Sequence, residues 1–359
     1  MTTPSALSPE QSPEQSRDGA PGPDAEQERA QEPVSGRDEA TDPAPAESAQ
    51  EPAEPTGPAP AEPIVVERTE NELRTLLGLG PVRAVLPLGV RARGWIVTGV
   101  VGLIAALLRL IGLNHPRTLM FDEIYYVKDA YSLWHLGYEG SWAANSDAAF
   151  ANGNFSGLST EAAYVVHPQL GKWLIGAGME IFGPESPFGW RFMPAVAGIL
   201  TAMLLARLTM RLTRSPLLAG LAGLLLAIDG VALTESRIGL LDVFIGFFAT
   251  LTLYCLVRDR EWSRARLARK MAGTVPGARA PRATIRPWLL AAAIALGLTC
   301  SIKWSGLYLV AVCGIAVVIW DTMALRRVGA RAWFLEGTVA QGVSDFLQAI
   351  PLVIAVYVG

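Results

Sequence analysis

Long apolar runs alternate with short polar segments from about residue 94 to the end of the 359-residue chain. A helix needs about 20 apolar residues to cross roughly 30 Å of bilayer hydrocarbon, and open sheets or loops cannot satisfy their backbone groups there. We therefore predict an all-α polytopic membrane protein with helices at 94–113, 189–212, 216–235, 239–257, 287–303, 304–320 and 337–359. The last run reaches the final residue, so we expect the chain to be truncated within a span.

One further apolar stretch, from Trp173 to Phe182, is too short to be assigned by length alone. If it crossed the membrane, the basic residues at 207–214 would move to the outer side. We therefore predict an interfacial helix on the external face.

Residues 1–63 differ in composition from the rest of the chain, because they consist mainly of Pro, Ala, Glu, Ser and Gln. Fourteen acidic residues stand against three arginines, and such a segment cannot bury enough apolar surface to become ordered. We predict a disordered acidic tail and juxtamembrane segment over 1–90, followed by a membrane domain over 91–359. Because the first apolar run begins behind this tail, we expect an uncleaved anchor and no signal peptide.

The basic residues beside the apolar runs predict the orientation. They cluster at 83–93, 207–214, 258–286 and 326–331, and all four clusters share one side if the N-terminus is cytoplasmic. The segment 114–188 then forms a large external loop with only three basic residues, against nine in the cytoplasmic loop 258–286. We expect a multi-pass protein of the cell membrane.

This topology places most of the remaining ionisable residues on the external side. They are Asp122, Glu123, His167, Lys172, Arg191, Glu235, Arg237, Asp242 and Lys303, with Arg109 one turn below. Ionisable groups near the membrane are expensive unless paired or hydrated, and they are candidates for function. The alternatives are structural ion pairs, or side chains that reach up to the interface.

Asp122 and Glu123 open a helical pattern that continues through Tyr125, Tyr126, Asp129, Ser132 and Leu133. Carboxylates at a helix N-terminus can simply cap it. Alternatively, one of them can act as a base that takes the proton from an acceptor hydroxyl during glycosyl transfer. Arginine suits the departing lipid phosphate, because guanidinium binds phosphate with two donors and keeps its charge. This chemistry predicts an active site on the external face.

His167 and Pro168 precede the short apolar stretch, and Lys172 follows within about one turn. A proline at a helix start explains Pro168 without function, whereas it explains neither His167 nor Lys172. The three cysteines lie in apolar runs, which predicts no disulfide framework and no metal site.

Five segments, taken in order, resemble a known family. They are FDEIYYVKDAYS at 121–132, HPQLGK at 167–172, WRFMPAVAG at 190–198, TESRIGLLD at 234–242 and SIKWSG at 301–306. The chain resembles the actinobacterial protein O-mannosyltransferases, which are GT-C membrane enzymes of glycosyltransferase family 39, over about three quarters of its length. Gln169 stands where the family usually has a second proline, HPPLGK.

This resemblance implies a GT-C helix bundle and an enzyme whose catalytic base is Asp122, with Glu123 beside it. It also implies that Arg109 and Arg191 match arginines needed for activity, which bind the carrier phosphate or orient the loop. Donor or substrate binding is expected of His167, Lys172, Arg237, Asp242 and Lys303.

The family uses polyprenyl phosphate mannose as donor and Ser or Thr of exported proteins as acceptor, with inversion at the anomeric carbon. The resemblance therefore implies no metal and no cofactor beyond the lipid-linked donor. Secreted or membrane proteins are the expected partners, the secretion translocon is a candidate partner, and no nucleic acid is expected.

Two other functions fit parts of the pattern. Another GT-C transferase could use the same base and arginines to transfer arabinose or a modified sugar to a glycan or lipid. A transporter or flippase would carry charges at mid-span and related halves. Here the charges gather at the ends of the predicted spans and no internal repeat is visible, so we favour the transferase.

Overall fold

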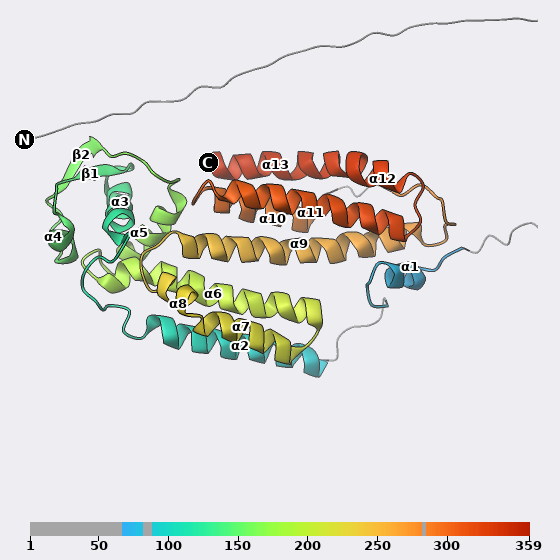
Figure 1. Ribbon diagram of the computed structural model, residues 1–359, viewed down its shortest axis with the longest axis horizontal. Helices are drawn as coiled ribbons and strands as arrows, with labels where there is room; N and C mark the ends of the chain where they lie inside the picture. Colours follow the sequence, from blue (N-terminus) through green and yellow to red (C-terminus); the bar gives the residue numbers. More distant parts are fainter. Residues whose placement is uncertain (1–66, 82–87, 282–284) are drawn as a thin grey trace, which may run out of the picture. The chain divides into compact units, whose positions relative to one another are not determined.

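Long helices that run alongside one another form most of the molecule (Figure 1). The computed structural model describes residues 67–81, 88–281 and 285–359. The bundle consists of α2 (Leu88–Leu110), α6 (Pro187–Thr213), α7 (Pro216–Ile228), α9 (Asp242–Met271), α10 (Pro287–Cys300), α11 (Gly306–Arg327) and α13 (Gly342–Val358). Helix α2 packs on α6 and α7, α6 on α9, α9 on α10, and α10 on α13.

Four helical segments in the described part of the chain are long and apolar enough to cross a bilayer. They are Gly89–Leu110, Pro187–Thr213, Gly306–Arg327 and Trp333–Val358. The last of these joins α12 (Trp333–Leu335), a π-helical turn (Glu336–Gln341) and α13. These segments confirm the prediction of a polytopic membrane protein.

Two of the predicted spans form shorter helices than expected. The run 216–235 breaks at Asp229, whose side chain accepts a hydrogen bond from the Ala232 backbone and begins α8 (Gly230–Glu235). This leaves α7 with 13 residues, and α10 has 14. At 1.5 Å per residue each is about 20 Å long, which is less than the hydrocarbon thickness.

Helix α9 is longer than predicted, because it continues from the apolar run 239–257 to Met271 and has 30 residues. Its second half contains arginine, alanine and leucine and has neither glycine nor proline. These residue types favour the helix and let it extend beyond its apolar part.

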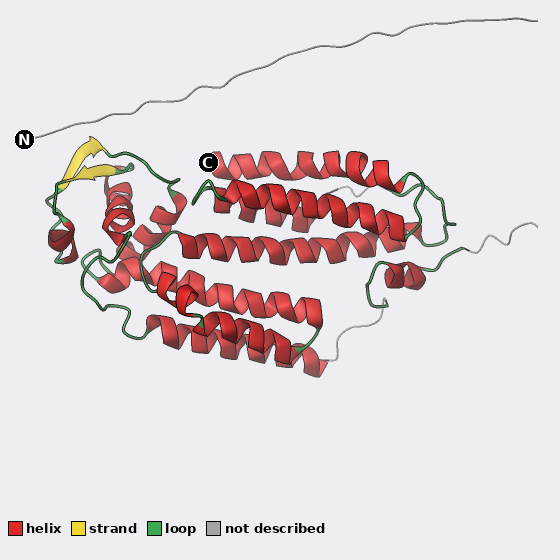
Figure 2. Ribbon diagram, viewed as in Figure 1, coloured by secondary structure: helices red, strands yellow, loops and turns green. Residues whose placement is uncertain are grey.

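A cap segment, which we define as residues 114–186, connects α2 to α6 at one end of the bundle (Figure 1). It contains α3 (Glu123–Leu136), β1 (Gly140–Trp142), α4 (Asp147–Ala151), β2 (Leu158–Ala162) and α5 (Leu170–Phe182). The antiparallel strands β1 and β2, yellow in Figure 2, were not predicted. Helix α5 includes the ambiguous stretch 173–182, and its 13 residues are too few to span a bilayer.

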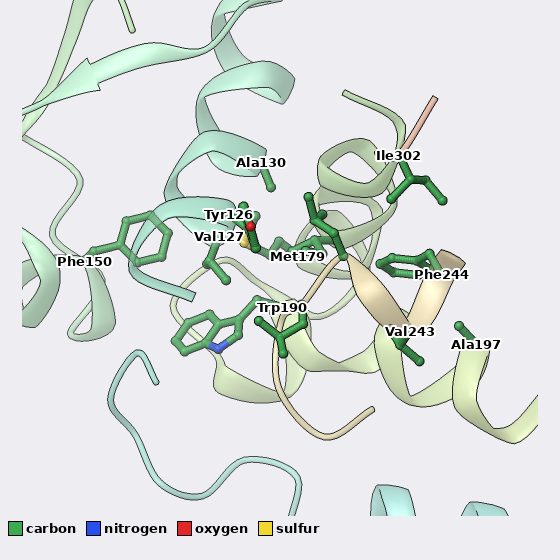
Figure 3. Close-up of a cluster of buried hydrophobic side chains, with 13 residues drawn as sticks. Tyr126, Val127, Ala130, Phe150, Met179, Trp190, Ala197, Val243, Phe244 and Ile302 are labelled. Carbon is green, nitrogen blue, oxygen red and sulfur yellow. The ribbon is translucent and has the colours of Figure 1, made fainter. Parts of the chain in front are cut away.

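A core of apolar side chains fixes the cap segment on the bundle (Figure 3). Val127 from α3, Trp190 from α6 and Ile302 from the turn after α10 are completely buried, and Phe244 from α9 is nearly so. Full burial of one such side chain stabilises the fold by about 1.5–3 kcal/mol. The junction between cap and bundle is therefore a rigid base for nearby side chains.

The opposite end of the bundle carries the basic residues, and we call it the basic end. Helix α1 (Glu70–Leu76), inside the range 1–90 where we expected tail and juxtamembrane segment, packs here against α9. Leu73 and Leu77 are fully buried, and Arg264 donates a hydrogen bond to the Leu77 carbonyl. The predicted acidic tail, 1–63, lies outside the described residues.

Candidate functional site

Asp122 lies where the cap segment meets the bundle, one residue before α3. Its side chain makes no capping hydrogen bond to the helix, and it forms no ion pair within the described ranges of the chain. The preceding Phe121 has a φ of 51°, which is rare for a residue other than glycine, and its ring is exposed. The capping alternative therefore does not explain Asp122, which keeps a half-buried and uncompensated carboxylate.

Tyr126, one turn further along α3, is the partner of this carboxylate. Burial, followed by the charges of Asp122 and Asp242 and a further interaction with the Asp122 side chain, raises the pKa of Tyr126 to about 12. The phenol is therefore protonated at neutral pH and can donate to Asp122. Its ring is part of the core in Figure 3 and lies 6.1 Å from the His167 ring. The sequence analysis included Tyr126 in the helical pattern but not among the candidate site residues, although its i+4 spacing from Asp122 could have indicated this.

A second carboxylate, Asp242, begins α9 and is paired with Lys303, which follows α10. The Lys303 Nζ lies 2.8 Å from Oδ1 and 2.7 Å from Oδ2 of Asp242. The side chains are 19% and 46% exposed, so the pair borders the surface and a ligand can reach it. Glu235 lies within electrostatic range of both residues.

His167, on the loop after β2, lies within electrostatic range of Asp242, Lys303 and Asp122. Burial and the ammonium groups of Lys303 and Lys172 lower the pKa of His167, against the opposing effect of Asp242 and Asp122. The imidazole is therefore mostly neutral at pH 7. The structure thus brings together four of the residues selected from the sequence: Asp122, His167, Asp242 and Lys303.

Glu123 lies inside the protein, whereas we expected it beside Asp122 on the external face. It is fully buried, and its carboxylate accepts hydrogen bonds from Arg191 Nε and Nη2 at 2.7 Å each. It also accepts from the backbone N–H of Gly239 at 2.7 Å and of Met120 at 2.8 Å. Glu123 therefore ties α3 to α6 and to the turn before α9, and these contacts favour a positioning role over the catalytic one that we expected.

Arg191 is buried together with Glu123 and is fully occupied by protein acceptors. Besides Glu123, its Nη1 donates to the carbonyls of Leu113 at 3.4 Å and Pro116 at 2.9 Å, and its Nη2 donates to that of Thr118 at 3.0 Å. The five N–H groups of a guanidinium are all used in this way. These contacts leave Arg191 no N–H group for the donor phosphate and favour the alternative that it orients the loop.

Lys172 is likewise directed into the protein. Its Nζ lies 2.7 Å from Glu139 and 3.1 Å from Asp129, and the lysine side chain is completely buried. Burial raises the pKa of both Asp129 and Glu139, and Lys172 opposes this shift. Lys172 therefore fixes α5 against α3 and is not placed to bind a donor. Neither of its partners was selected from the sequence.

The two remaining arginines meet at the end of α2. Nη1 of Arg237 donates to the carbonyls of Leu108 at 2.5 Å, Arg109 at 3.1 Å and Ile111 at 3.0 Å, so Arg237 caps the helix. Arg109 is buried and donates to the Ala227 carbonyl at 3.0 Å. Arg237 remains half-exposed, whereas Arg109 is buried.

This arrangement combines a carboxylate without a cationic partner among the described residues, a phenol beside it, a neutral imidazole and an accessible ammonium group. The carboxylate can accept a proton, and the ammonium group can stabilise negative charge on a leaving group. No group of three or more His, Cys, Asp or Glu residues that could hold a metal ion occurs where the structure is described. That the reaction needs no metal stays a prediction.

The depressed pKa of His167 predicts how stability depends on pH. An unfolded histidine takes up its proton near pH 6.5, whereas the folded protein resists this protonation. The free energy of unfolding should therefore fall as the pH falls below about 6.5. His167→Gln should reduce this loss, measured as the unfolding midpoint against pH in detergent. The same substitution at the exposed His135 is the control, and an equal effect of both would contradict the prediction.

A family model and several known proteins indicate the same family for this chain. Residues 158–359 match the model of the family described as dolichyl-phosphate-mannose-protein mannosyltransferase. The polyprenol-phosphate-mannose–protein mannosyltransferase of Mycolicibacterium smegmatis is 37% identical over 242 residues, which are 66% of this chain and 43% of the relative. The protein of the same name from Mycobacterium tuberculosis is 35% identical over 308 residues, 82% of this chain and 54% of the relative.

The fold is similar to that of a solved relative. The S. cerevisiae protein O-mannosyltransferase Pmt1-Pmt2 complex bound to the sugar donor matches with a TM-score of 0.56 at 20% identity, over 83% of this chain and 36% of that chain. This likeness confirms the predicted GT-C helix bundle. The present chain spans about half the length of the curated relatives that it matches.

Proposed function

Because the chain belongs to the dolichyl-phosphate-mannose-protein mannosyltransferase family, we propose that it transfers mannose from polyprenyl phosphate mannose to Ser or Thr hydroxyls of exported proteins. The single observation that carries the proposal is the state of Asp122. Among the described residues it has neither a cationic partner nor a capping bond, and it shares its neighbour His167 with the accessible ammonium group of Lys303.

In the proposed reaction, the acceptor hydroxyl oxygen attacks the anomeric carbon of the mannose. Asp122 takes the hydroxyl proton, and the bond between the anomeric carbon and the phosphate oxygen breaks with its electron pair on the phosphate. The products are the O-mannosylated side chain, with inverted configuration, and polyprenyl phosphate. The protonated hydroxyl of Tyr126 lies within interaction range of Asp122 and can donate a hydrogen bond that holds the carboxylate in place.

Lys303 is the cation best placed to meet the departing phosphate. It lies within electrostatic range of His167, and its pairing with Asp242 is partly exposed and can open to a ligand. Arg237, five residues before Asp242 in the chain, is half-exposed and is the candidate for a second positive charge. This assignment replaces Arg191 and Lys172, whose donors are directed into the protein.

The proposed site faces outward across the cell membrane. The basic residues of α6, α9 and α11 lie at the opposite end of the bundle, and such residues favour the cytoplasmic side. An external site suits acceptors that are exported through the secretion pathway. The translocon is therefore a candidate partner.

The test is a transfer assay with membranes that contain the full-length protein. Polyprenyl phosphate carrying radiolabelled mannose is the donor, and a Ser/Thr-rich peptide is the acceptor. We expect label on this peptide and none on a peptide in which every Ser and Thr is replaced by Ala. Transfer of arabinose instead of mannose, or label only on glycan or lipid, would overturn the proposal in favour of another transferase activity.

A further inference from the structure

Three arginines at the basic end have no role in the proposed reaction. Arg207 and Arg211 lie on successive turns of α6, and Arg258 lies on the adjacent α9. Arg211 interacts electrostatically with both of the others, so the three charges form one group. Glu261, 3.3 Å from Arg211, is the acidic residue of this group and leaves it with a net charge of about +2.

Each of these arginines lies over an aromatic ring. The Arg207 guanidinium is 3.9 Å from the Trp95 ring centre, that of Arg258 is 4.1 Å from Trp288, and that of Arg211 is 5.8 Å from the ring of Tyr254. A guanidinium that stacks on a ring has one face covered, and its N–H groups point outward in its own plane. The stacking therefore fixes the cations and leaves their donors available at the edges.

The donors of this arginine group have few acceptors in the protein. The side chains of Arg207 and Arg258 form no hydrogen bond or ion pair with any residue in 67–81, 88–281 or 285–359. The Nε of both Arg207 and Arg211 is buried and has no hydrogen-bond partner. The terminal N–H groups of Arg207 and Arg258 are therefore the donors that an oxygen-rich anion can reach, and such an anion would be stabilised by charge-assisted hydrogen bonds.

The position of the group indicates where that anion comes from. Arg207 lies 20 residues after Pro187, the first residue of α6, which corresponds to about 30 Å along the helix and to the thickness of the hydrocarbon. Trp95 is 62% exposed beside it. Arginine together with tryptophan at this depth is typical of the boundary between lipid and water, where anionic headgroups bind basic pockets between helices.

We propose that Arg207, Arg211 and Arg258, stacked on Trp95, Tyr254 and Trp288, bind the phosphate of an anionic glycerophospholipid at the end of the bundle opposite the catalytic site. The phosphate oxygens accept the in-plane N–H groups of the arginines. The aromatic rings lie against the upper part of the acyl chains. This binding does not depend on the proposed mannosyl transfer.

The test is native mass spectrometry of the full-length protein, purified in detergent and mixed with phosphatidylglycerol or phosphatidylcholine. The site variant is Arg207→Gln with Arg211→Gln and Arg258→Gln. The control variant removes three positive charges from the same end by Arg214→Gln, Arg327→Gln and Arg331→Gln, at exposed residues outside the group. We expect the site variant to bind phosphatidylglycerol about tenfold more weakly, which corresponds to about 1.4 kcal/mol, and the control variant to bind as the wild type does.

Three outcomes would overturn the inference. If the site variant and the control variant lost phosphatidylglycerol equally, the binding would be nonspecific attraction to charge. If the wild-type protein retained phosphatidylglycerol and phosphatidylcholine equally, a site for an anionic headgroup would be excluded. Displacement of phosphatidylglycerol by inorganic phosphate alone would identify a site for the free ion. Should the triple variant fail to fold, Arg211→Lys keeps the charge but loses the planar donors, and it should still weaken binding severalfold.

Discussion

Asp122→Asn should lower kcat for mannosyl transfer by about 10²- to 10⁴-fold, the range by which a general base contributes to catalysis. The amide has nearly the volume of the carboxylate but cannot take up the acceptor proton. Its side chain has no cap or ion pair to lose among the described residues, so the fold and membrane insertion should be unchanged. The measurement is the initial rate at saturating donor and peptide in the radiolabelled transfer assay.

Asp147→Asn is a matched control for this variant. Asp147 also lies near the start of a helix in the cap segment, is partly exposed and pairs with Lys128 at 2.7 Å. Its replacement should change kcat by less than about threefold, since surface pairs contribute little. If Asp122→Asn retained a rate similar to that of Asp147→Asn, the proton would have to go elsewhere, and Asp122 would not be the base.

The helices were predictable because each apolar run is long and the bilayer permits little else. The runs also predict that the charged residues after α2, before α9 and after α10 lie at one end. The break at Asp229 and the extension of α9 were not predicted, because one depends on a side-chain cap and the other on a polar helix beyond the membrane. Strands β1 and β2 are too short to show an alternating pattern.

The site was predictable as a set of residues but not as a set of contacts. Asp122 and Glu123 are adjacent, and helical geometry turns successive side chains by about 100°, so one faces the opening while the other enters the core. The sequence does not say which one does so. Glu139 and Lys172 are 33 residues apart, and only the folded cap segment brings them together. Resemblance to a family indicates that such residues are needed, but it does not show whether they take part in the reaction or position other groups.

Arg191→Gln should therefore act mainly on stability. The Glu123–Arg191 pair is almost completely buried, and removing one partner of a buried pair costs about 3–5 kcal/mol because the other charge is left without compensation. The loop carbonyls of Pro116 and Thr118 also lose their donor. We expect a large fall in the thermal unfolding midpoint, measured by fluorescence in detergent, and loss of transfer activity together with it.

The double variant Glu123→Gln with Arg191→Gln separates this positioning role from phosphate binding. If the two side chains mainly compensate each other, the double variant should lose clearly less stability than the sum of the two single variants, because no isolated charge remains. A phosphate-binding Arg191 predicts a different result. Its replacement would raise the KM for polyprenyl phosphate mannose at unchanged unfolding midpoint, and Glu123→Gln would add its effect independently. An arginine whose five N–H groups already meet protein oxygens has none to offer a ligand until that pair is broken.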